Sequence, residues 1–297
     1  MPPGQHILAI RAGSLGDTIL TFPAIAALVA PGNRVELLGT LPYSELAKTP
    51  GLAHDVHSID RARFRAFFDE RAEDRELLTF LEAFDLIVAW ARLPLLGVKA
   101  DRLQLRCVET SPNPPEAVHA SDHLMASVRA LGFRAPVAPP ELRFGDPSPL
   151  LDLYGLTPAS FIAIHPSSGS PKKNWPPHWF AEFARCATAA GQDLLWIQGE
   201  ADHDVVSSLS RAVPGPVAAE LPLRDLATLL ASSAAFIGND SGVSHLAAAA
   251  GAPTLALFLS TDPRQWAPRG RSVRVVEAGA SPEAVWGFTL ALKERRY

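Results

Sequence analysis

Three polar segments of the sequence combine residue types that can bind anions and move protons. They span residues 12–17, 165–175 and 238–245, and each follows a short apolar run. The first ends in a carboxylate, Asp17, which could act as a general base. The second carries serines, a glycine and two lysines, of which Lys173 is the last, and such residues suit phosphate oxygens. The segments therefore indicate proton removal combined with anion binding.

The first segment has two interpretations. Gly13 and Gly16 allow a tight turn, and Asp17 lies at the start of the helix that follows. Asp is a favoured N-cap residue, so a purely structural role is one alternative. A carboxylate after a buried strand can also face a cleft and serve as a base. The complete G-x-G-x-x-G fingerprint is missing, which argues against a dinucleotide cofactor.

The second and third segments resemble anion cradles. Residues 165–175 lack the Walker A spacing, so they are not a P-loop. Their serines, glycine and lysines form either a diphosphate cradle of another kind or a solvated polar loop. In the third segment, Asp240-Ser241-Gly242 enters a helix whose first N–H groups lack helical partners. Asp240 is there either part of an anion site or a cap, and His245, one turn into the helix, is expected to be a buried, hydrogen-bonded histidine.

Other patterns argue against a metal. Asp202 and Asp204 have D-x-D spacing, but they begin a helix without another ligand nearby, so an exposed acidic first turn is expected. The histidines show no zinc spacing. The sequence therefore predicts no metal site.

Alternating strands and helices must position these loops. Continuous apolar runs predict buried parallel strands, and Gly, Pro and capping residues delimit the helices between them. The fold class is α/β, with two Rossmann-like series in tandem. The expected strands are 6–11, 35–38, 85–90, 161–164, 193–197, 235–237 and 254–258, and the expected helices are 18–29, 60–82 (a solvated helix), 121–131, 176–190, 201–212, 223–232, 241–250 and one starting at 281.

Length and composition agree with this organisation. The 297 residues exceed what one core usually serves, and the proline-rich segment 134–149 predicts a linker between two domains. A net charge of −4 gives no support for nucleic-acid binding. Two isolated cysteines, no signal-peptide pattern and no run of apolar residues long enough to span a bilayer predict a cytoplasmic protein.

The three loops, in this order, resemble glycosyltransferase family 9, the lipopolysaccharide heptosyltransferases. The resemblance rests on the Arg-x-x-x-x-Gly-Asp pattern with a downstream proline, on the His-Pro-Ser-Ser-Gly and Lys-Asn-Trp-Pro elements, and on Gly-Asn-Asp-Ser-Gly-Val-Ser-His-Leu with a following Thr-Asp-Pro. These elements are residues 11–17 with Pro23, 165–169, 173–176, 238–246 and 261–263.

The resemblance implies a GT-B fold, in which two Rossmann-like domains face a central cleft. Residues 1–145 would form the acceptor-side domain and residues 146–280 the domain that binds the nucleotide sugar. Residues 281–297 would form a C-terminal helix that crosses back to pack on the first domain. The implied activity is an inverting transfer of a sugar, typically heptose, from an ADP-sugar to an acceptor hydroxyl, without a metal or any other cofactor.

The resemblance also assigns roles to individual residues. Asp17 would be the base that deprotonates the acceptor hydroxyl. Ser167, Ser168 and Lys173 would hold the diphosphate of the donor. Growing charge on that leaving group could then be stabilised by Lys173 and helix N-termini.

The third loop and the loop after strand 193–197 complete the implied donor site. Asp240 would hydrogen-bond the sugar, the amides of Ser241 and Gly242 would approach phosphate, and His245 would support the site. An acidic residue, Glu200 or alternatively Asp202, would hold the ribose.

The acceptor side is less defined by the resemblance. The acceptor would be a glycan or lipid-linked glycan, with at most peripheral contact with a membrane. Several arginines between 61 and 75 are interleaved with acids, so they belong either to an anion-binding surface or to a solvated helix. The acceptor-side candidates are Arg11, Gly16, Arg61 and Arg63.

Three alternatives remain open. The same scaffold could use another nucleotide sugar, such as a UDP-hexose, or it could bind a nucleotide sugar without transferring it. Loss of Asp17 would be the signature of a non-catalytic protein, and Asp17 is present. An NAD-dependent oxidoreductase would require the missing glycine fingerprint.

Overall fold

The computed structural model describes residues 4–29, 32–134, 141–277 and 279–294, and these form two compact α/β units. The units are Met1–Pro140 and Glu141–Tyr297. The expected linker, 134–149, is too long, because helix α5 (Ser148–Tyr154) begins within it. Pro149 lies in the first turn of that helix, where its missing N–H would have no helical partner in any case. Residues 135–140 of the expected linker lie outside the described part of the chain.

The first unit is built on a parallel sheet of five strands in the order β3-β2-β1-β4-β5. Every pairing between neighbouring strands is parallel, and helical segments connect the strands. Its elements are β1 (His6–Arg11), α1 (Leu15–Val29), β2 (Arg34–Gly39), the 3-10 helix η1 (Tyr43–Ala47), β3 (Asp55–Ser58), the 3-10 helix η2 (Ala62–Phe67), α2 (Arg75–Leu81), β4 (Leu86–Ala89), α3 (Leu96–Arg102), β5 (Arg106–Glu109) and α4 (Ala120–Ala130).

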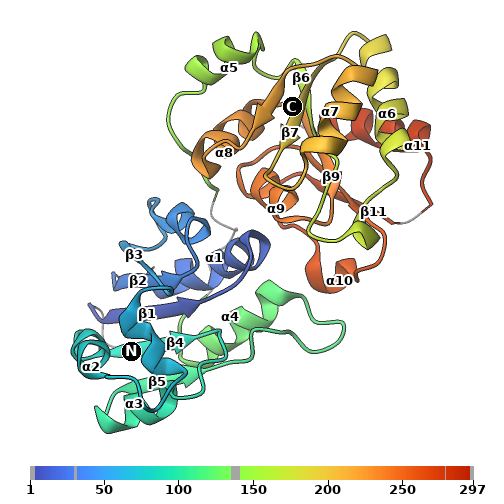
Figure 1. Cartoon of the computed structure of the whole chain (residues 1–297). Helices are drawn as coiled ribbons and strands as arrows, with labels where there is room; N and C mark the ends of the chain where they lie inside the picture. The colour runs from blue at the N-terminus through green and yellow to red at the C-terminus, as the bar shows by residue number, and fades with distance from the viewer. Residues whose placement is uncertain (1–3, 30–31, 135–140, 278, 295–297) are drawn as a thin grey trace. The chain divides into compact units, whose positions relative to one another are not determined.

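Both faces of the first sheet are covered. Leu8 and Ile10 of β1 point toward one face, where they share an apolar cluster with Phe64 of η2 and Leu77 of α2. Because side chains alternate along a strand, Ile7 and Ala9 point to the opposite face. Helices α1 and α4 pack against each other in this unit, away from α2 and α3 (Figure 1). Burial on both faces explains the continuous apolar run of β1.

The second unit repeats the design with a parallel sheet of six strands in the order β11-β10-β9-β6-β7-β8. Its remaining elements are β6 (Phe161–His165), the 3-10 helix η3 (Pro171–Lys173), α6 (Pro177–Ala189), β7 (Asp193–Gln198), α7 (His203–Ala212), β8 (Val217–Ala219), α8 (Leu223–Ser232), β9 (Ala235–Asn239), α9 (Gly242–Ala249), β10 (Thr254–Phe258), α10 (Pro263–Trp266), β11 (Val273–Glu277) and α11 (Pro282–Glu294).

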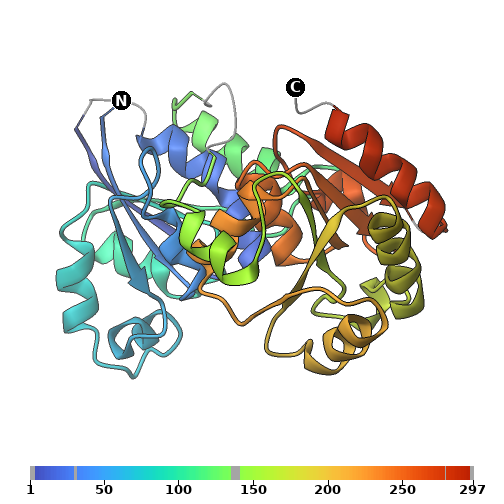
Figure 2. The same ribbon diagram turned by 90° about the horizontal axis from the view of Figure 1, so that it is seen from above.

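Helices cover both faces of the second sheet as well. Helices α6, α7 and α11 pack over one face, where Ile164, Trp196 and Ile237 join Phe180 in a single cluster. Helices α8 and α9 lie on the other face, and Figure 2 shows this layered arrangement from above. No helix in the described part of the chain is both long and apolar enough to cross a membrane.

The C-terminal helix α11 belongs to the second unit, where it packs against α6, β9, β10 and β11. Its expected packing on the first domain stays a prediction. Val285 is fully buried in the same cluster as Phe183, and Trp286 lies edge-on to that phenylalanine. Apolar residues of α11 are thus buried in the core of the second unit, to which the helix belongs.

The sequence analysis did not predict four of the strands, and all four lie at the edges of the sheets. β3, β5, β8 and β11 each lie at the end of a sheet and are only partly buried, whereas β4, β6, β9 and β10 are buried throughout. A strand exposed along one side needs no continuous apolar run, so the pattern used to find strands is missing there.

The expected solvated helix at 60–82 is also wrong. The segment forms η2, a turn and the short helix α2, and it buries Phe64, Phe67 and Leu77 under the sheet. The charged residues between these buried apolar side chains lie on the solvent-exposed side of the segment. Because they dominate its composition, the segment resembled a solvated helix.

Each sheet reverses its strand order beside its first strand. In the first unit the chain adds β2 and β3 on one side of β1, then β4 and β5 on the other. In the second unit β7 and β8 lie on one side of β6, and β9 to β11 on the other. Ligands of open α/β sheets bind outside the carboxyl ends of the strands at such reversals. The loops after β1 and β4, and after β6 and β9, are therefore the places to examine.

Candidate active site

Asp17 forms an ion pair with Arg11 at the carboxyl end of β1. Arg11 Nη2 donates to Asp17 Oδ1 at 2.8 Å, and the guanidinium is almost fully buried. Arg11 Nη1 donates to the carbonyl oxygens of Trp90, at 3.0 Å, and Pro112, at 3.5 Å. Burial lowers the pKa of Arg11, while the Asp17 carboxylate opposes that shift. Arg11 therefore ties the loops after β4 and β5 to the carboxylate, which itself keeps about 30% of its side-chain surface in solvent.

Asp17 is not the N-cap of α1, as one interpretation of the sequence had it. Ser14 precedes the helix, and Asp17 lies three residues later, where its Oδ2 accepts from the Ser14 amide at 3.1 Å and from the Ser14 hydroxyl at 2.9 Å. This is a capping box with Asp in the third helical position. A Cβ on Gly13 would lie 2.9 Å from the Asp17 Cβ, so only glycine fits beside the carboxylate. Gly16 is buried in the first turn of α1.

On the second sheet, Lys173 and Asp240 form an ion pair between the loops after β6 and β9. Lys173 Nζ lies 2.7 Å from Asp240 Oδ2, and Thr261 Oγ1 donates to the same oxygen at 2.5 Å. The carboxylate is buried, whereas about a third of the lysine side chain is exposed. Asp240 Oδ1 has no hydrogen bond among the described residues. The pair offers a positioned ammonium group and one unused carboxylate oxygen.

The N-terminus of α9 lies beside this pair. Ser241 is the N-cap, so the sequence-based alternative that Asp240 caps the helix is wrong. The Ser241 hydroxyl accepts no hydrogen bond from the helix amides. The Gly242 and Val243 amides have no hydrogen-bond partner in the described structure. Such amides attract negative charge. His245 is buried one turn into the helix.

His165, at the end of β6, joins three loops of the second unit. Its Nε2 lies 2.9 Å from Asp202 Oδ2, and its Nδ1 lies 3.4 Å from the Ser241 hydroxyl. Burial alone would raise the pKa of Asp202, but hydrogen bonds from His165, the Gly199 amide and the Ser167 hydroxyl hold it below its usual value. Asp202 is thus a buried structural carboxylate.

This network separates the two ribose candidates and corrects the expected exposed acidic turn. Asp202 is buried, and its Oδ2 is bonded to His165 and to the Gly199 amide, while Glu200 is exposed in the same loop after β7. Asp204, the other half of the D-x-D pattern, is exposed. Of the two carboxylates, Glu200 is the one available to a ligand.

The serines of the second loop face inward. Ser167 is buried, and the Ser168 hydroxyl lies 2.6 Å from Asn174 Oδ1. Sequence reasoning missed Asn239, which is completely buried and accepts from the Trp175 amide at 2.8 Å while donating to the Pro166 carbonyl at 2.9 Å. A polar residue at the end of a buried strand, next to Asp240, is the signal that could have identified it.

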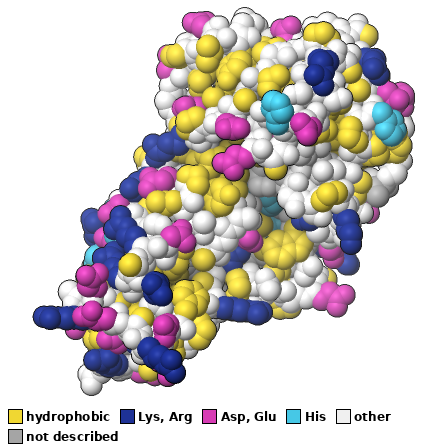
Figure 3. Space-filling model, viewed as in Figure 1, with side chains coloured by type: hydrophobic (Ala, Val, Ile, Leu, Met, Phe, Trp, Pro, Cys, Tyr) yellow, Lys and Arg dark blue, Asp and Glu magenta, His cyan; other side chains and the backbone are white. Residues whose placement is uncertain are grey.

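The arginines around η2 do not gather into a basic site. Arg63 stacks over the rings of Phe64 and Phe80, at 4.8 and 4.3 Å from their centroids, and burial lowers its pKa. Arg61 is exposed at the start of η2. Figure 3 shows basic and acidic side chains interleaved over the surface of the first unit. The structure thus brings neither residue together with Arg11 and Asp17.

Another polar cluster lies within the first sheet. Both oxygens of Glu36 accept hydrogen bonds, Oε1 from His6 at 2.9 Å and Oε2 from His57 at 2.7 Å, and Arg34 also pairs with Oε1. Glu36, Asp55 and His57 are close enough to hold a metal ion, but Arg34 and Lys48 already neutralise the two carboxylates. Burial alone would raise the pKa of Glu36, and the hydrogen bonds overcome this and lower it from 4.5 to about 2.

This cluster makes the first unit sensitive to acid. Because the folded-state pKa of Glu36 is depressed, its contribution of about 3 kcal/mol is present above pH 4.5 and is lost as the pH falls toward 2. In Glu36→Gln we expect this part of the pH dependence to disappear. Hydrogen exchange of β1–β3 peptides measures it, and Glu70→Gln, at an exposed position, is the control. An unchanged acid profile in Glu36→Gln would contradict the prediction.

The fold, with polar loops after β1 and β4 in the first unit and after β6 and β9 in the second, defines a two-unit α/β protein. Known glycosyltransferases have the same architecture. A family 9 glycosyltransferase from Veillonella parvula has a TM-score of 0.85 at 17% identity, covering 99% of this chain and 98% of that one. The E. coli heptosyltransferase WaaC, solved with ADP, has a TM-score of 0.73 at 18% identity, covering 97% and 99%. These structural neighbours have the GT-B fold, as the sequence predicted.

Sequence comparison gives the family. The model of glycosyltransferase family 9 (heptosyltransferase) matches residues 102–286. Lipopolysaccharide heptosyltransferase 1 of Pseudomonas aeruginosa is 26% identical over 305 aligned positions, covering 90% of this chain and 82% of that protein. The chain therefore belongs to glycosyltransferase family 9 and is a heptosyltransferase-like glycosyltransferase.

Proposed function

We propose that this chain transfers a heptose from an ADP-sugar to a hydroxyl of a lipopolysaccharide-type glycan, with inversion at the anomeric carbon. The observation that carries the proposal is the site between β6 and β9. There, a lysine held by a buried carboxylate lies beside helix amides that have no partner. This arrangement suits a diphosphate, whose two phosphates need a cation and N–H donors.

On the donor side, Lys173 neutralises charge that develops on the leaving diphosphate, and the α9 amides share it. Lys173 has three N–H donors, of which Asp240 takes one, so two remain for phosphate oxygens. The free Oδ1 of Asp240 accepts a sugar hydroxyl, and Glu200 accepts the ribose hydroxyls. These groups supply the stabilisation that a divalent cation supplies in other glycosyltransferases, so the proposed reaction uses no metal and no other cofactor.

On the acceptor side, Asp17 removes the proton from the attacking hydroxyl. The hydroxyl oxygen bonds to the anomeric carbon as the bond to the diphosphate breaks, and one carboxylate on the face opposite the leaving group gives inversion. Arg11 and Ser14 hold the carboxylate in one orientation, while its exposed surface leaves lone pairs for the proton.

The relatives support the choice of donor and acceptor. WaaC was solved with ADP and, in another structure, with ADP-2-deoxy-2-fluoro heptose, and the Pseudomonas relative is a lipopolysaccharide heptosyltransferase. We place the enzyme in the cytoplasm, with at most peripheral contact with the membrane that carries a lipid-linked acceptor.

Calorimetric titration with ADP, UDP, GDP and NAD tests the donor assignment. We expect ADP to bind selectively and Glu200→Gln to weaken that binding about tenfold, since a charged hydrogen bond to the ribose is lost. Asp204→Gln, an exposed acid in the same region, is the matched control. Preference for UDP or GDP would keep the mechanism and change the donor, whereas binding of NAD alone would overturn the proposal.

A further inference from the structure

Asn239 is the last residue of β9, and its side chain bonds both ends of the loop that connects β6 with α6. The backbone pairing of β6 with β9 ends one residue before it. Beyond that point Asn239 Oδ1 accepts from the Trp175 amide at 2.8 Å, and Nδ2 donates to the Pro166 carbonyl oxygen at 2.9 Å. The side-chain amide thus closes the base of the loop, residues 166–175, with one acceptor and one donor, as a peptide group would.

The Asn239 side chain is fully buried, and its amide also faces the interior of the loop. Nδ2 lies 3.5 Å from Asn174 Oδ1, which accepts from the Ser168 hydroxyl at 2.6 Å. A buried polar group costs free energy unless it is hydrogen-bonded, and a satisfied one fixes its neighbours in a single arrangement. An apolar residue would fill the end of β9 without specifying the loop, so the asparagine indicates that the conformation of the loop matters.

Both parts of the proposed diphosphate site are attached to this one residue. Lys173, which pairs with Asp240, lies in the loop that the Asn239 side chain closes. Helix α9 is attached through the Asn239 backbone, whose carbonyl oxygen accepts from the buried Ser244 hydroxyl at 2.5 Å. Asn239 therefore fixes the lysine relative to the first turn of α9, and a substitution of its side chain releases only the loop.

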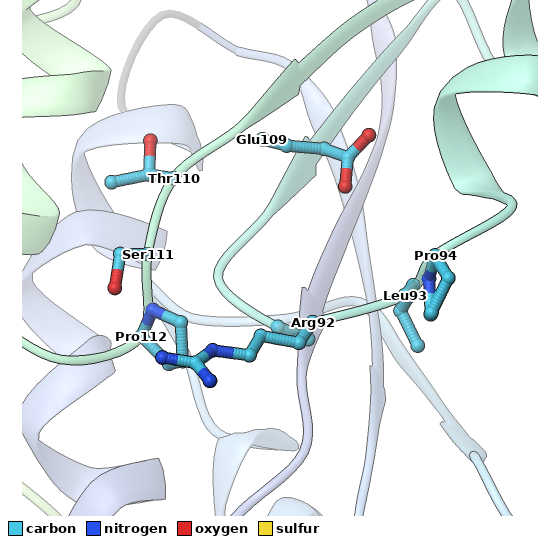
Figure 4. A pocket seen from close by; sticks show the side chains of 8 residues that line it. Arg92, Leu93, Pro94, Glu109, Thr110, Ser111 and Pro112 are labelled. Atoms are coloured by element: carbon cyan, nitrogen blue, oxygen red, sulfur yellow. The ribbon is translucent and has the colours of Figure 1, made fainter.

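A polar side chain at a strand end also joins loops in the first unit. Arg11, at the end of β1, donates to the Trp90 and Pro112 carbonyl oxygens and connects the loops after β4 and β5. Pro112 lies in the lining of an open hollow of about 300 Å³ between these loops (Figure 4). Arg11 holds the proposed base as well as these loops. By the same principle, Asn239 holds the loop that carries the proposed cation.

We propose that Asn239 is a positioning residue for donor binding: by closing the loop, it places Lys173 where the diphosphate binds. The buried amide is out of reach of a ligand and acts through the lysine. The inference deepens the proposed function and rests on it, because the ligand of Lys173 is the diphosphate named there. Without the asparagine, ADP has to order the loop as it binds, and this cost lowers its affinity.

Asn239→Ala tests the proposal in the full chain. We expect ADP to bind about three- to tenfold more weakly by calorimetry, a smaller loss than for Lys173→Ala because the lysine remains. Adenosine, which has no phosphates, should bind the variant and the native protein alike. In the Lys173→Ala background, Asn239→Ala should change the ADP affinity by less than about twofold, because the group through which it acts is gone.

Asn33→Ala is the matched control. Asn33 is also a buried asparagine that bridges two backbone groups: it accepts from the Gln5 amide at 3.0 Å and donates to the Leu28 carbonyl oxygen at 2.9 Å. It belongs to the first unit, so its loss should lower the thermal stability and leave ADP binding unchanged.

Asn174→Ala is a second, milder variant at a half-buried position. It removes the oxygen that Ser168 and Asn239 share inside the loop, and ADP should bind it about two- to fivefold more weakly. If Asn239→Ala does not fold, Asn174→Ala takes its place in the comparison with Lys173→Ala.

Native ADP affinity in these loop variants would overturn the proposal. Equal losses for ADP and adenosine, effects that add to that of Lys173→Ala, or an equal loss in Asn33→Ala would also overturn it. If ADP binding depends on Lys173 but not on Asn239, only this inference fails and the donor assignment stands. If the native protein binds no ADP, the proposed function is wrong, and this inference fails with it.

Discussion

Asp17→Asn is expected to abolish measurable sugar transfer while leaving the affinity for ADP unchanged. The asparagine keeps the volume and one carbonyl oxygen, which can still accept from Arg11 or Ser14, but it cannot take a proton from a hydroxyl at neutral pH. Loss of a general base lowers kcat by about 10²–10⁴-fold. Transfer is measured by ADP release in the presence of acceptor, and ADP affinity by calorimetry.

Ser14→Ala is the matched control for this experiment. It removes the hydroxyl that donates to Asp17 Oδ2 and leaves the carboxylate in place. We expect it to cost about 0.5–2 kcal/mol of stability, as for other caps, with kcat much less affected. If Asp17→Asn lost only stability, as Ser14→Ala should, and kept its turnover, Asp17 would be a capping residue and the proposed mechanism would be wrong.

Lys173→Ala is expected to weaken ADP binding by about 1.5–3 kcal/mol, which is a ten- to hundredfold change in Kd. The substitution removes the cation that Asp240 holds at 2.7 Å, and it leaves that buried carboxylate with Thr261 as its remaining partner. Two effects then combine, since the diphosphate loses an ammonium group and approaches an unneutralised negative charge.

Lys172→Ala separates this specific effect from general electrostatics. Lys172 is the preceding residue, is exposed and has no partner in the described structure, so its loss should change the ADP affinity by less than about threefold. Adenosine, which has no phosphates, should bind Lys173→Ala and the native protein alike. Equal effects of both lysine substitutions, or an effect on adenosine as large as that on ADP, would contradict a diphosphate contact by Lys173.

The sequence by itself determined the fold class and the places where chemistry occurs. Apolar runs such as 161–164 and 254–258 are local features, because a strand buried on both faces must be apolar at every position. The loops that follow these strands could therefore be identified without coordinates, and their motifs indicated the family that the comparisons confirm. Edge strands such as β5 were missed, since partial exposure removes the pattern.

The tertiary structure alone decided which of these residues meet. Lys173 and Asp240 are 67 positions apart, and they pair because β6 and β9 are neighbours in the sheet. The same packing buries Asp202 under His165 and leaves Glu200 in solvent, although both are acids in one short loop. Residue type and spacing describe the chain along its length, whereas burial and ion pairing depend on distances through space, which only the order of the strands sets.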